Sequence, residues 1–190
     1  THVVLVGAMP DGGRTATLYS LVRAHDAYTS NVQLIEMHSQ APIEGVRHNV
    51  FDPQKDGSEY STLVRSILRR DPDVVAVAEI DDETAKVLSR ADAGHMRVYA
   101  TIKADDPLKA IQGFAQMVGV QKKAAACLGG VVCVKLARRL CHNCKVGIQP
   151  TPENLKKLGL PAETKQLFRK GGKVLVKDKE QVCPVCAGVG

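Results

Sequence analysis

Short apolar runs alternate with longer amphipathic segments along the first two thirds of this 190-residue chain. The apolar runs predict strands at residues 3–6, 32–36, 74–78, 98–102 and 130–134. The segments between them predict helices at about residues 15–25, 60–70, 82–91, 107–117 and 121–128. Strands that alternate with helices are typical of βαβ units, so we expect an α/β fold with a mainly parallel sheet.

The pattern changes after residue 144. Thr151 and Pro152 are typical of the N-cap and the first residue of a helix, which is expected to end near Gly159. A second short helix is expected at 161–170, and the alternation at 173–177 predicts an edge strand. This part of the chain is therefore expected to form a small lobe of its own.

Composition is ordinary for a soluble globular protein, with 44% apolar and 24% charged residues. Aromatic residues make up 4% and Trp is absent, so the core must consist mainly of aliphatic side chains. No apolar run is long enough to span a bilayer, and no signal peptide opens the chain. Because the chain begins directly with an apolar run and ends abruptly, we expect a domain cut from a longer protein.

Charge is distributed unevenly. Residues 1–120 carry 12 basic and 16 acidic side chains, whereas residues 121–190 carry 14 basic and 4 acidic ones. A basic segment of this kind suits an anionic partner such as a phospholipid headgroup, a nucleic acid or an acidic protein surface. A solvated, lysine-rich surface is the alternative, since a run of charge alone selects no partner.

Four cysteines in two CxxC pairs form the most specific metal-binding pattern. Cys141 and Cys144 make one pair, and Cys183 and Cys186 make the other. Each pair places two thiolates on one tight turn, and two such turns supply the closed tetrahedral ligand set of a structural zinc ion. Free thiols or a redox CxxC are the alternatives, but a redox site needs a helix that begins directly after the first cysteine. We therefore predict one structural zinc site.

The other two cysteines lie in different surroundings. Cys127 follows three alanines, and Cys133 lies between valines, so both are expected to be buried core residues. The absence of a secretory signal together with the CxxC pairs indicates a reducing compartment rather than disulfides.

A glycine-rich turn follows the first predicted strand. Residues 7–15 read GAMPDGGRT, and a strand, a glycine-rich turn, a cation and a threonine at a helix start are the layout of a phosphate-binding loop. In the pattern GxxxxGK[ST], Arg14 takes the place of the lysine and Thr15 that of the Mg²⁺-binding hydroxyl. The candidate nucleotide-binding residues are Gly12, Gly13, Arg14, Thr15 and Ala16.

Departures from that pattern weaken the loop. Ala8 replaces the first glycine, and Pro10 has no N–H group to offer a phosphate. Asp11 places a carboxylate where phosphate oxygens approach, and Arg14 replaces a compact ammonium with a broad guanidinium. The loop is therefore expected to bind a nucleoside triphosphate poorly, or to keep the fold without the ligand.

Residues 69–85, RRDPDVVAVAEIDDETA, closely resemble the RQDPDVIMVGEIRDxETA segment of the type II secretion and type IV pilus assembly ATPases. Further motifs of this family occur in the same order along the chain. Residues 15–19 resemble TTTLY, Gly94 and His95 resemble the start of the histidine box, and residues 135–144 resemble RLxRRLCxxC. The second CxxC pair ends the tetracysteine element, so the resemblance covers essentially the whole chain.

This resemblance implies a RecA-like P-loop NTPase fold for residues 1–140 and a small zinc-binding helical lobe for residues 141–190. It implies a cytoplasmic hexameric ring, peripheral at the inner membrane, that hydrolyses ATP with Mg²⁺ to drive secretion or pilus assembly. The platform proteins of the inner membrane are the partners that it implies. It also implies a preceding N-terminal domain that completes the nucleotide pocket.

Site roles follow from motif positions. In this resemblance, Glu79 occupies the position of the family's catalytic glutamate, which orients or deprotonates the attacking water. His95 occupies the position of the histidine that senses the nucleotide state. Arg65, Arg69 and Glu36 are candidates for contacts to a neighbouring subunit or a phosphate. From the residues alone, the arginines also suit an exposed helix face and His95 a structural histidine, whereas a glutamate after a buried strand is costly without a role.

Three functions remain. The chain is a working motor ATPase domain, a degenerate member with weak nucleotide binding and reduced or absent hydrolysis, or a binding module that uses the basic zinc lobe on nucleic acid or an anionic membrane. Ala78 for the glycine before Glu79 and Lys103 for the second histidine of the box add to the departures in the loop, so the second function is favoured. Nucleic acid ranks last, because only Phe168 is available for base stacking.

Overall fold

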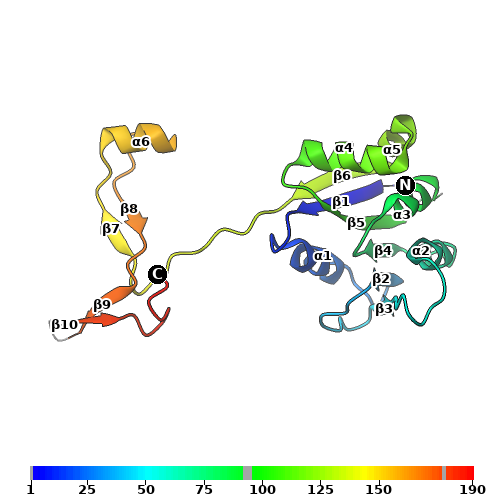
Figure 1. Cartoon of the computed structure of the whole chain (residues 1–190), viewed down its shortest axis with the longest axis horizontal. Helices are drawn as coiled ribbons and strands as arrows, with labels where there is room; N and C mark the ends of the chain where they lie inside the picture. The colour runs from blue at the N-terminus through cyan, green and yellow to red at the C-terminus, as the bar shows by residue number, and fades with distance from the viewer. Residues whose placement is uncertain (1, 92–95, 177–178) are drawn as a thin grey trace. The chain divides into compact units, whose positions relative to one another are not determined.

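The structure is a computed structural model that describes residues 2–91, 96–176 and 179–190. It divides into two compact units, Thr1–Leu136 and Ala137–Gly190, which are drawn with all their elements in Figure 1. Each unit is described by itself.

The first unit is built on a six-stranded sheet in the order β3-β2-β4-β5-β1-β6. Its strands are β1 His2–Ala8, β2 Val32–Glu36, β3 Arg47–Val50, β4 Val74–Val77, β5 Arg97–Lys103 and β6 Leu128–Cys133. Every strand pair in this sheet is parallel, which confirms the expected α/β fold. β3 was not predicted, because its sequence RHNV is polar and its side chains lie at the sheet edge, half-buried or exposed.

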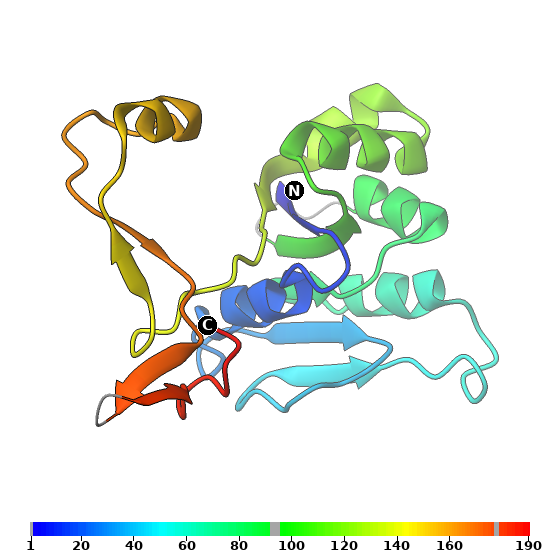
Figure 2. The ribbon, with the colours of Figure 1, turned by 60° about the vertical axis from the view of Figure 1, so that its left-hand side comes forward.

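Helices cover both faces of the sheet. They are α1 Arg14–Arg23, α2 Tyr60–Leu68, α3 Asp82–Arg90, α4 Pro107–Val118 and α5 Gln121–Cys127. Leu18, Tyr19 and Val22 of α1 belong to one apolar cluster, whereas α2 to α5 contribute to a second, larger one. Figure 2 shows α2, α3 and α4 lying one after another beside the sheet.

Local signals define several helix ends. The Asp81 side chain accepts a hydrogen bond from the backbone N–H of Thr84 at the start of α3, and Asp106 caps α4 in the same way. α4 ends at Gly119, which has a left-handed φ of 74°. These caps explain why the helix positions agree closely with the sequence pattern.

In its described residues, 137–176 and 179–190, the second unit contains one helix and two antiparallel strand pairs. Its elements are β7 Val146–Ile148, α6 Pro152–Leu158, β8 Leu167–Arg169, β9 Lys173–Val176 and β10 Lys179–Val182. β7 pairs with β8, and β9 pairs with β10. The predicted first helix and edge strand are found as α6 and β9, and Thr151 caps α6 through its side chain.

The expected second helix at 161–170 is wrong. The strand β8 occupies its C-terminal part, because Leu167–Arg169 finds a hydrogen-bonding partner in β7 that lies about twenty residues earlier in the chain. Among residues 2–91, 96–176 and 179–190, none of the helices has both the length and the hydrophobicity that a membrane span requires.

Candidate functional site

The carboxyl ends of β1, β2 and β4 lie at the same edge of the parallel sheet, where ligands bind in folds of this type. The glycine-rich loop follows β1, Glu36 ends β2, and Glu79 comes two residues after β4. The backbone N–H of Ala78 donates to the carbonyl of Ile35 over 2.9 Å, so Glu36 and Glu79 each follow one of two paired residues. The fold thus brings these two predicted site residues together.

Of these residues, Glu79 has the environment that most clearly indicates contact with a ligand. Its side chain is half-buried, and its Oε2 atom is buried without a hydrogen-bond partner in the part of the chain that the structure describes. Burial raises the pKa of Glu79, and the negative charge of Glu36 adds to this rise. The backbone of Met37 and the charges of Arg14 and His38 act in the opposite direction. The carboxylate is therefore more basic than an ordinary glutamate.

Glu36 lies in a different environment. It is 1% exposed, the hydroxyl of Tyr19 donates to its Oε2 over 2.5 Å, and Nδ1 of His48 lies 2.8 Å from its Oε1. Both oxygens have hydrogen-bond partners, whereas Oε2 of Glu79 has none among residues 2–91, 96–176 and 179–190. Two neighbouring carboxylates with such different environments can take different roles: one as a fixed charge, the other as a base.

Tyr60, at the start of α2, also belongs to this site. Its hydroxyl donates to the carbonyl of Ile35 over 3.0 Å. Burial, followed by the charge of Glu79, raises the pKa of Tyr60 above its usual range, so the hydroxyl stays protonated. Neither Tyr60 nor His48 was predicted as a site residue, because no motif or spacing marks them; Tyr19 lies in the TTTLY-like segment and could have been found there.

The glycine-rich loop is a tight turn that closes partly on itself. Gly12 donates its N–H to the carbonyl of Met9 over 2.9 Å, and a Cβ atom at Gly12 would lie 2.8 Å from that oxygen. Asp11 has a left-handed φ of 57°, and Gly13, with φ of 95°, is the N-cap of α1. Arg14 begins the helix, so a cation stands at a helix N-terminus that faces the edge holding Glu79.

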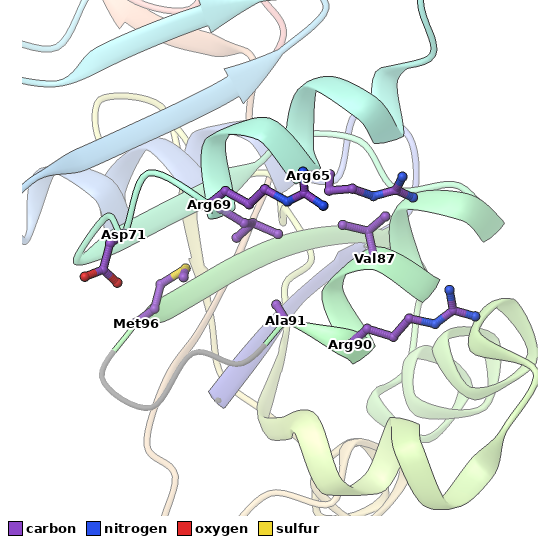
Figure 3. A pocket seen from close by; sticks show the side chains of 8 residues that line it. Arg65, Arg69, Asp71, Val87, Arg90, Ala91 and Met96 are labelled. Atoms are coloured by element: carbon purple, nitrogen blue, oxygen red, sulfur yellow. The ribbon is translucent and has the colours of Figure 1, made fainter.

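Arg65 and Arg69 lie elsewhere. With Arg90 of α3 they line a hollow of about 680 Å³ that also includes Asp71 and Met96 (Figure 3). Asp71 precedes β4 and Met96 directly precedes β5, so this hollow lies near the amino ends of the strands. Glu79 lies after the carboxyl end of β4. Within one chain these arginines are therefore not brought to the edge that holds Glu79. His95 lies outside the described residues.

The four cysteines predicted to bind zinc converge. Their Sγ atoms all lie within 4.8 Å of one another, with 3.9 Å between Cys141 and Cys183 and 3.6 Å between Cys144 and Cys186. A tetrahedral zinc site with Zn–S distances of about 2.3 Å has S–S edges of about 3.8 Å. The cluster has the size and the donor set that zinc requires.

Three N–H groups point at these sulfurs. Gly172 donates to Cys144 and Gly190 donates to Cys186, both over 3.2 Å. The Asn143 side chain donates to Cys183 over 3.4 Å and lowers the pKa of that thiol. Such hydrogen bonds stabilise thiolates, the form that binds metal.

The second unit has little other core. Its buried apolar residues, among those described, are Cys144, Leu155 and Cys183. A unit of this size with so small a core needs a further cross-link, and a metal ion bound by the four cysteines would supply one. Of the two remaining cysteines, Cys127 is buried as expected, whereas Cys133 is only half-buried.

Comparisons with known proteins agree with this organisation. The family model described as "Type II/IV secretion system protein" matches residues 2–187. The type IV pilus assembly ATPase PilB of Thermus thermophilus is 33% identical over 190 residues, which are 99% of this chain and 20% of that protein. The type II secretion system protein HxcR of Pseudomonas aeruginosa is 33% identical over 146 residues, which are 76% of this chain and 31% of that protein.

Solved structures show the same fold. The pilus retraction motor PilT with bound ADP matches with a TM-score of 0.55 at 18% identity, over 88% of this chain and 45% of that one. The VirB11 ATPase of the Brucella suis type IV secretion system, in complex with sulphate, matches with a TM-score of 0.51 at 19% identity, over 66% of this chain and 38% of that one. The chain spans a fifth to a third of the length of the two curated relatives. It belongs to the type II/IV secretion system protein family, as the family model and these relatives show.

Proposed function

We propose that this chain is the nucleotide-binding region of a type II secretion or type IV pilus assembly motor, and that it binds MgATP weakly and hydrolyses it slowly. The observation that carries this proposal is the buried Oε2 atom of Glu79 at the carboxyl edge of the sheet, for which the described part of the chain offers no hydrogen-bond partner. Burying an ionisable oxygen without a partner is costly, and such groups cluster at functional sites.

Glu79 is the proposed general base. Its raised pKa suits a group that takes a proton from an attacking water near neutral pH. The N-terminus of α1 would receive the phosphates, with the guanidinium of Arg14 as the cation and the hydroxyl of Thr15 as a ligand for Mg²⁺. Gly13 and Ala16 would complete this cradle with backbone N–H groups.

Weak binding follows from the loop itself. A phosphate-binding loop grips its ligand with consecutive backbone N–H groups. Here Pro10 has none, and Gly12 donates its own to Met9. The carboxylate of Asp11 adds repulsion toward a triphosphate, so fewer donors and one like charge meet the ligand.

The assembled motor is also part of the proposal. Arg65 and Arg69 lie near the amino ends of β4 and β5, so they would act on a phosphate or acidic group only across a contact with a second copy in a hexameric ring. His95 is proposed to respond to the nucleotide state. Platform proteins of the inner membrane, or the anionic membrane surface, are the proposed partners of the ring, and zinc is the proposed stabiliser of the second unit.

Calorimetric titration with MgATP tests nucleotide binding. The native chain is compared with an Asp11→Gly, Arg14→Lys double variant and with Glu79→Gln as the matched control at the same edge. We expect weak binding by the native chain, tighter binding by the double variant, and unchanged binding with lost turnover in Glu79→Gln. Micromolar binding and rapid turnover by the native chain would contradict the weakened loop. Turnover that survives Glu79→Gln would remove the proposed base.

A further inference from the structure

We infer that His48 is a positioning residue for the proposed reaction: it holds the buried carboxylate of Glu36 and the segment 37–46 in the arrangement that presents Glu79 to its substrate. This inference rests on the proposed function for its catalytic consequence, although the positioning itself can be tested without nucleotide. His48 lies on the edge strand β3, beside β2 in the parallel register Leu34 to His48.

The hydrogen bonds of His48 define its tautomer. The backbone N–H of Ile43 donates to Nε2 over 3.0 Å, so Nε2 must be the acceptor and carry no hydrogen. The proton of the neutral ring is therefore on Nδ1, which lies 2.8 Å from Oε1 of Glu36 and donates to it. A protonated ring would lose the bond from Ile43, because an imidazolium has no acceptor.

The same two side chains hold Glu36 and the segment that follows it. Tyr19 donates to Glu36 and accepts a hydrogen bond from the backbone N–H of Gln40 over 3.2 Å. His48 donates to Glu36 and accepts from Ile43. Segment 37–46 is thus fixed at two points to the partners of one carboxylate.

This arrangement affects the pKa of Glu79 in two ways. The backbone of Met37, the first residue of the segment, lowers the pKa of Glu79, so the position of the segment affects the pKa of that carboxyl group. The charge of Glu36 raises the pKa of Glu79, and the hydrogen bonds from Tyr19 and His48 to the two oxygens of Glu36 hold that carboxylate in place. The other titratable groups that act on Glu79 or face it are Arg14, His38 and Tyr60.

Two substitutions separate the two bonds of His48. His48→Asn keeps a donor near the position of Nδ1 and loses the acceptor for Ile43, whereas His48→Gln reaches the position of Nε2 and loses the donor to Glu36. In the nucleotide-free chain, ¹⁵N spectra of the imidazole should report the Nδ1–H tautomer. The titration of the Glu79 carboxyl, followed by ¹³C spectra, should move to lower pH in His48→Gln. It should stay closer to native in His48→Asn, because that variant keeps a donor to Glu36 and the hydrogen bond from Gln40 to Tyr19 still holds the segment.

Turnover supplies the second readout. At saturating MgATP we expect kcat to fall on the order of 10- to 100-fold in His48→Gln, the loss typical of misplaced groups, with KM nearly unchanged. His48→Asn should retain most of the native kcat. An Nε2–H tautomer in the native chain, or equal effects of the two variants on the titration of Glu79, would overturn the inference even if one variant fails to fold.

The two proposals fail in different ways. If the native chain neither binds nor turns over MgATP while the titration of Glu79 still responds to His48→Gln alone, the proposed function is wrong and the positioning of Glu36 by His48 stands. If MgATP is turned over and both variants match the native kcat, the positioning role is wrong and the proposed function stands.

Discussion

The hydroxyl of Tyr19 lies 2.5 Å from a carboxylate oxygen of Glu36 and joins helix α1 to the carboxyl end of strand β2. Tyr19→Phe removes this donor and leaves a buried carboxylate with one partner fewer. We expect the free energy of unfolding to fall by about 1–3 kcal/mol, the usual cost of a buried polar group left unsatisfied. Urea unfolding measures this change.

Tyr28→Phe is the matched control for Tyr19→Phe. Its hydroxyl also donates to a carboxylate, that of Glu44, but Tyr28 is 78% exposed and water can replace the bond. Its free energy of unfolding should change by no more than about 0.5 kcal/mol. Equal losses of unfolding free energy in the two variants would show that the burial of Glu36 does not determine how much the Tyr19 hydrogen bond contributes to stability.

Glu79→Gln should separate activity from stability. The amide cannot accept the proton of an attacking water, so we expect turnover to fall by about 10²- to 10⁴-fold. The amide also carries no charge to desolvate, so thermal unfolding at neutral pH should shift to higher temperature. Glu44→Gln, on the surface, should leave the unfolding temperature nearly unchanged. A lower unfolding temperature in Glu79→Gln would mean that the carboxylate stabilises the fold.

The same carboxylate predicts a pH dependence. The folded state raises the pKa of Glu79, so it binds this proton more tightly than the unfolded chain does. The contribution of Glu79 to stability is therefore present below the pKa of the unfolded chain and is lost as pH rises through the folded-state pKa. The stability difference between Glu79→Gln and the native chain should grow over that interval. Urea unfolding of both chains from pH 4 to pH 8 would measure this difference in unfolding free energy. A difference that shrinks as pH rises would mean that folding lowers the pKa of Glu79 rather than raising it.

Gly171 packs against the backbone of one of the four clustered cysteines. A Cβ atom at this position would collide with the backbone carbonyl of Cys144, so Gly171→Ala must displace a ligand-bearing turn. We expect zinc affinity, measured by competition with a chelator, to fall on the order of 10- to 100-fold. Gly159→Ala is the control: a Cβ there meets nothing within 4 Å, and its φ of 63° costs about 1 kcal/mol without moving a ligand. Equal zinc affinities would contradict this packing argument.

Loss of a ligand should affect the second unit alone. Cys141→Ser is expected to lower the zinc content from one ion per chain toward none and to loosen residues 141–190, because that unit has little other core. Hydrogen exchange should show unchanged protection in the sheet of the first unit. Cys133→Ser, outside the cluster, should retain the metal. Loss of protection in β1 or β5 of Cys141→Ser would contradict the independence of the two units.

Local pattern accounts for most of the fold. β2 and β4 are buried along their whole length; β4 is a continuous apolar run, and β2 is apolar at three of its five positions, so both are visible in the sequence. The caps at Asp106 and Thr151 likewise act within one helical turn of the residues they satisfy. β8 could not be predicted in this way, because its pairing with β7 depends on a partner distant in the chain.

The same division holds for the sites. The alternation of strands and helices, the family motifs and the cysteine pairs can be recognised from the sequence, since each depends on residues close together in the chain. Packing, by contrast, determines that Tyr19 and His48 hold Glu36, that one oxygen of Glu79 has no partner among the residues described, and that Arg65 lies away from that edge. The physical reason is that hydrogen-bond satisfaction and burial depend on which side chains the packed sheet brings together, and no local spacing encodes that.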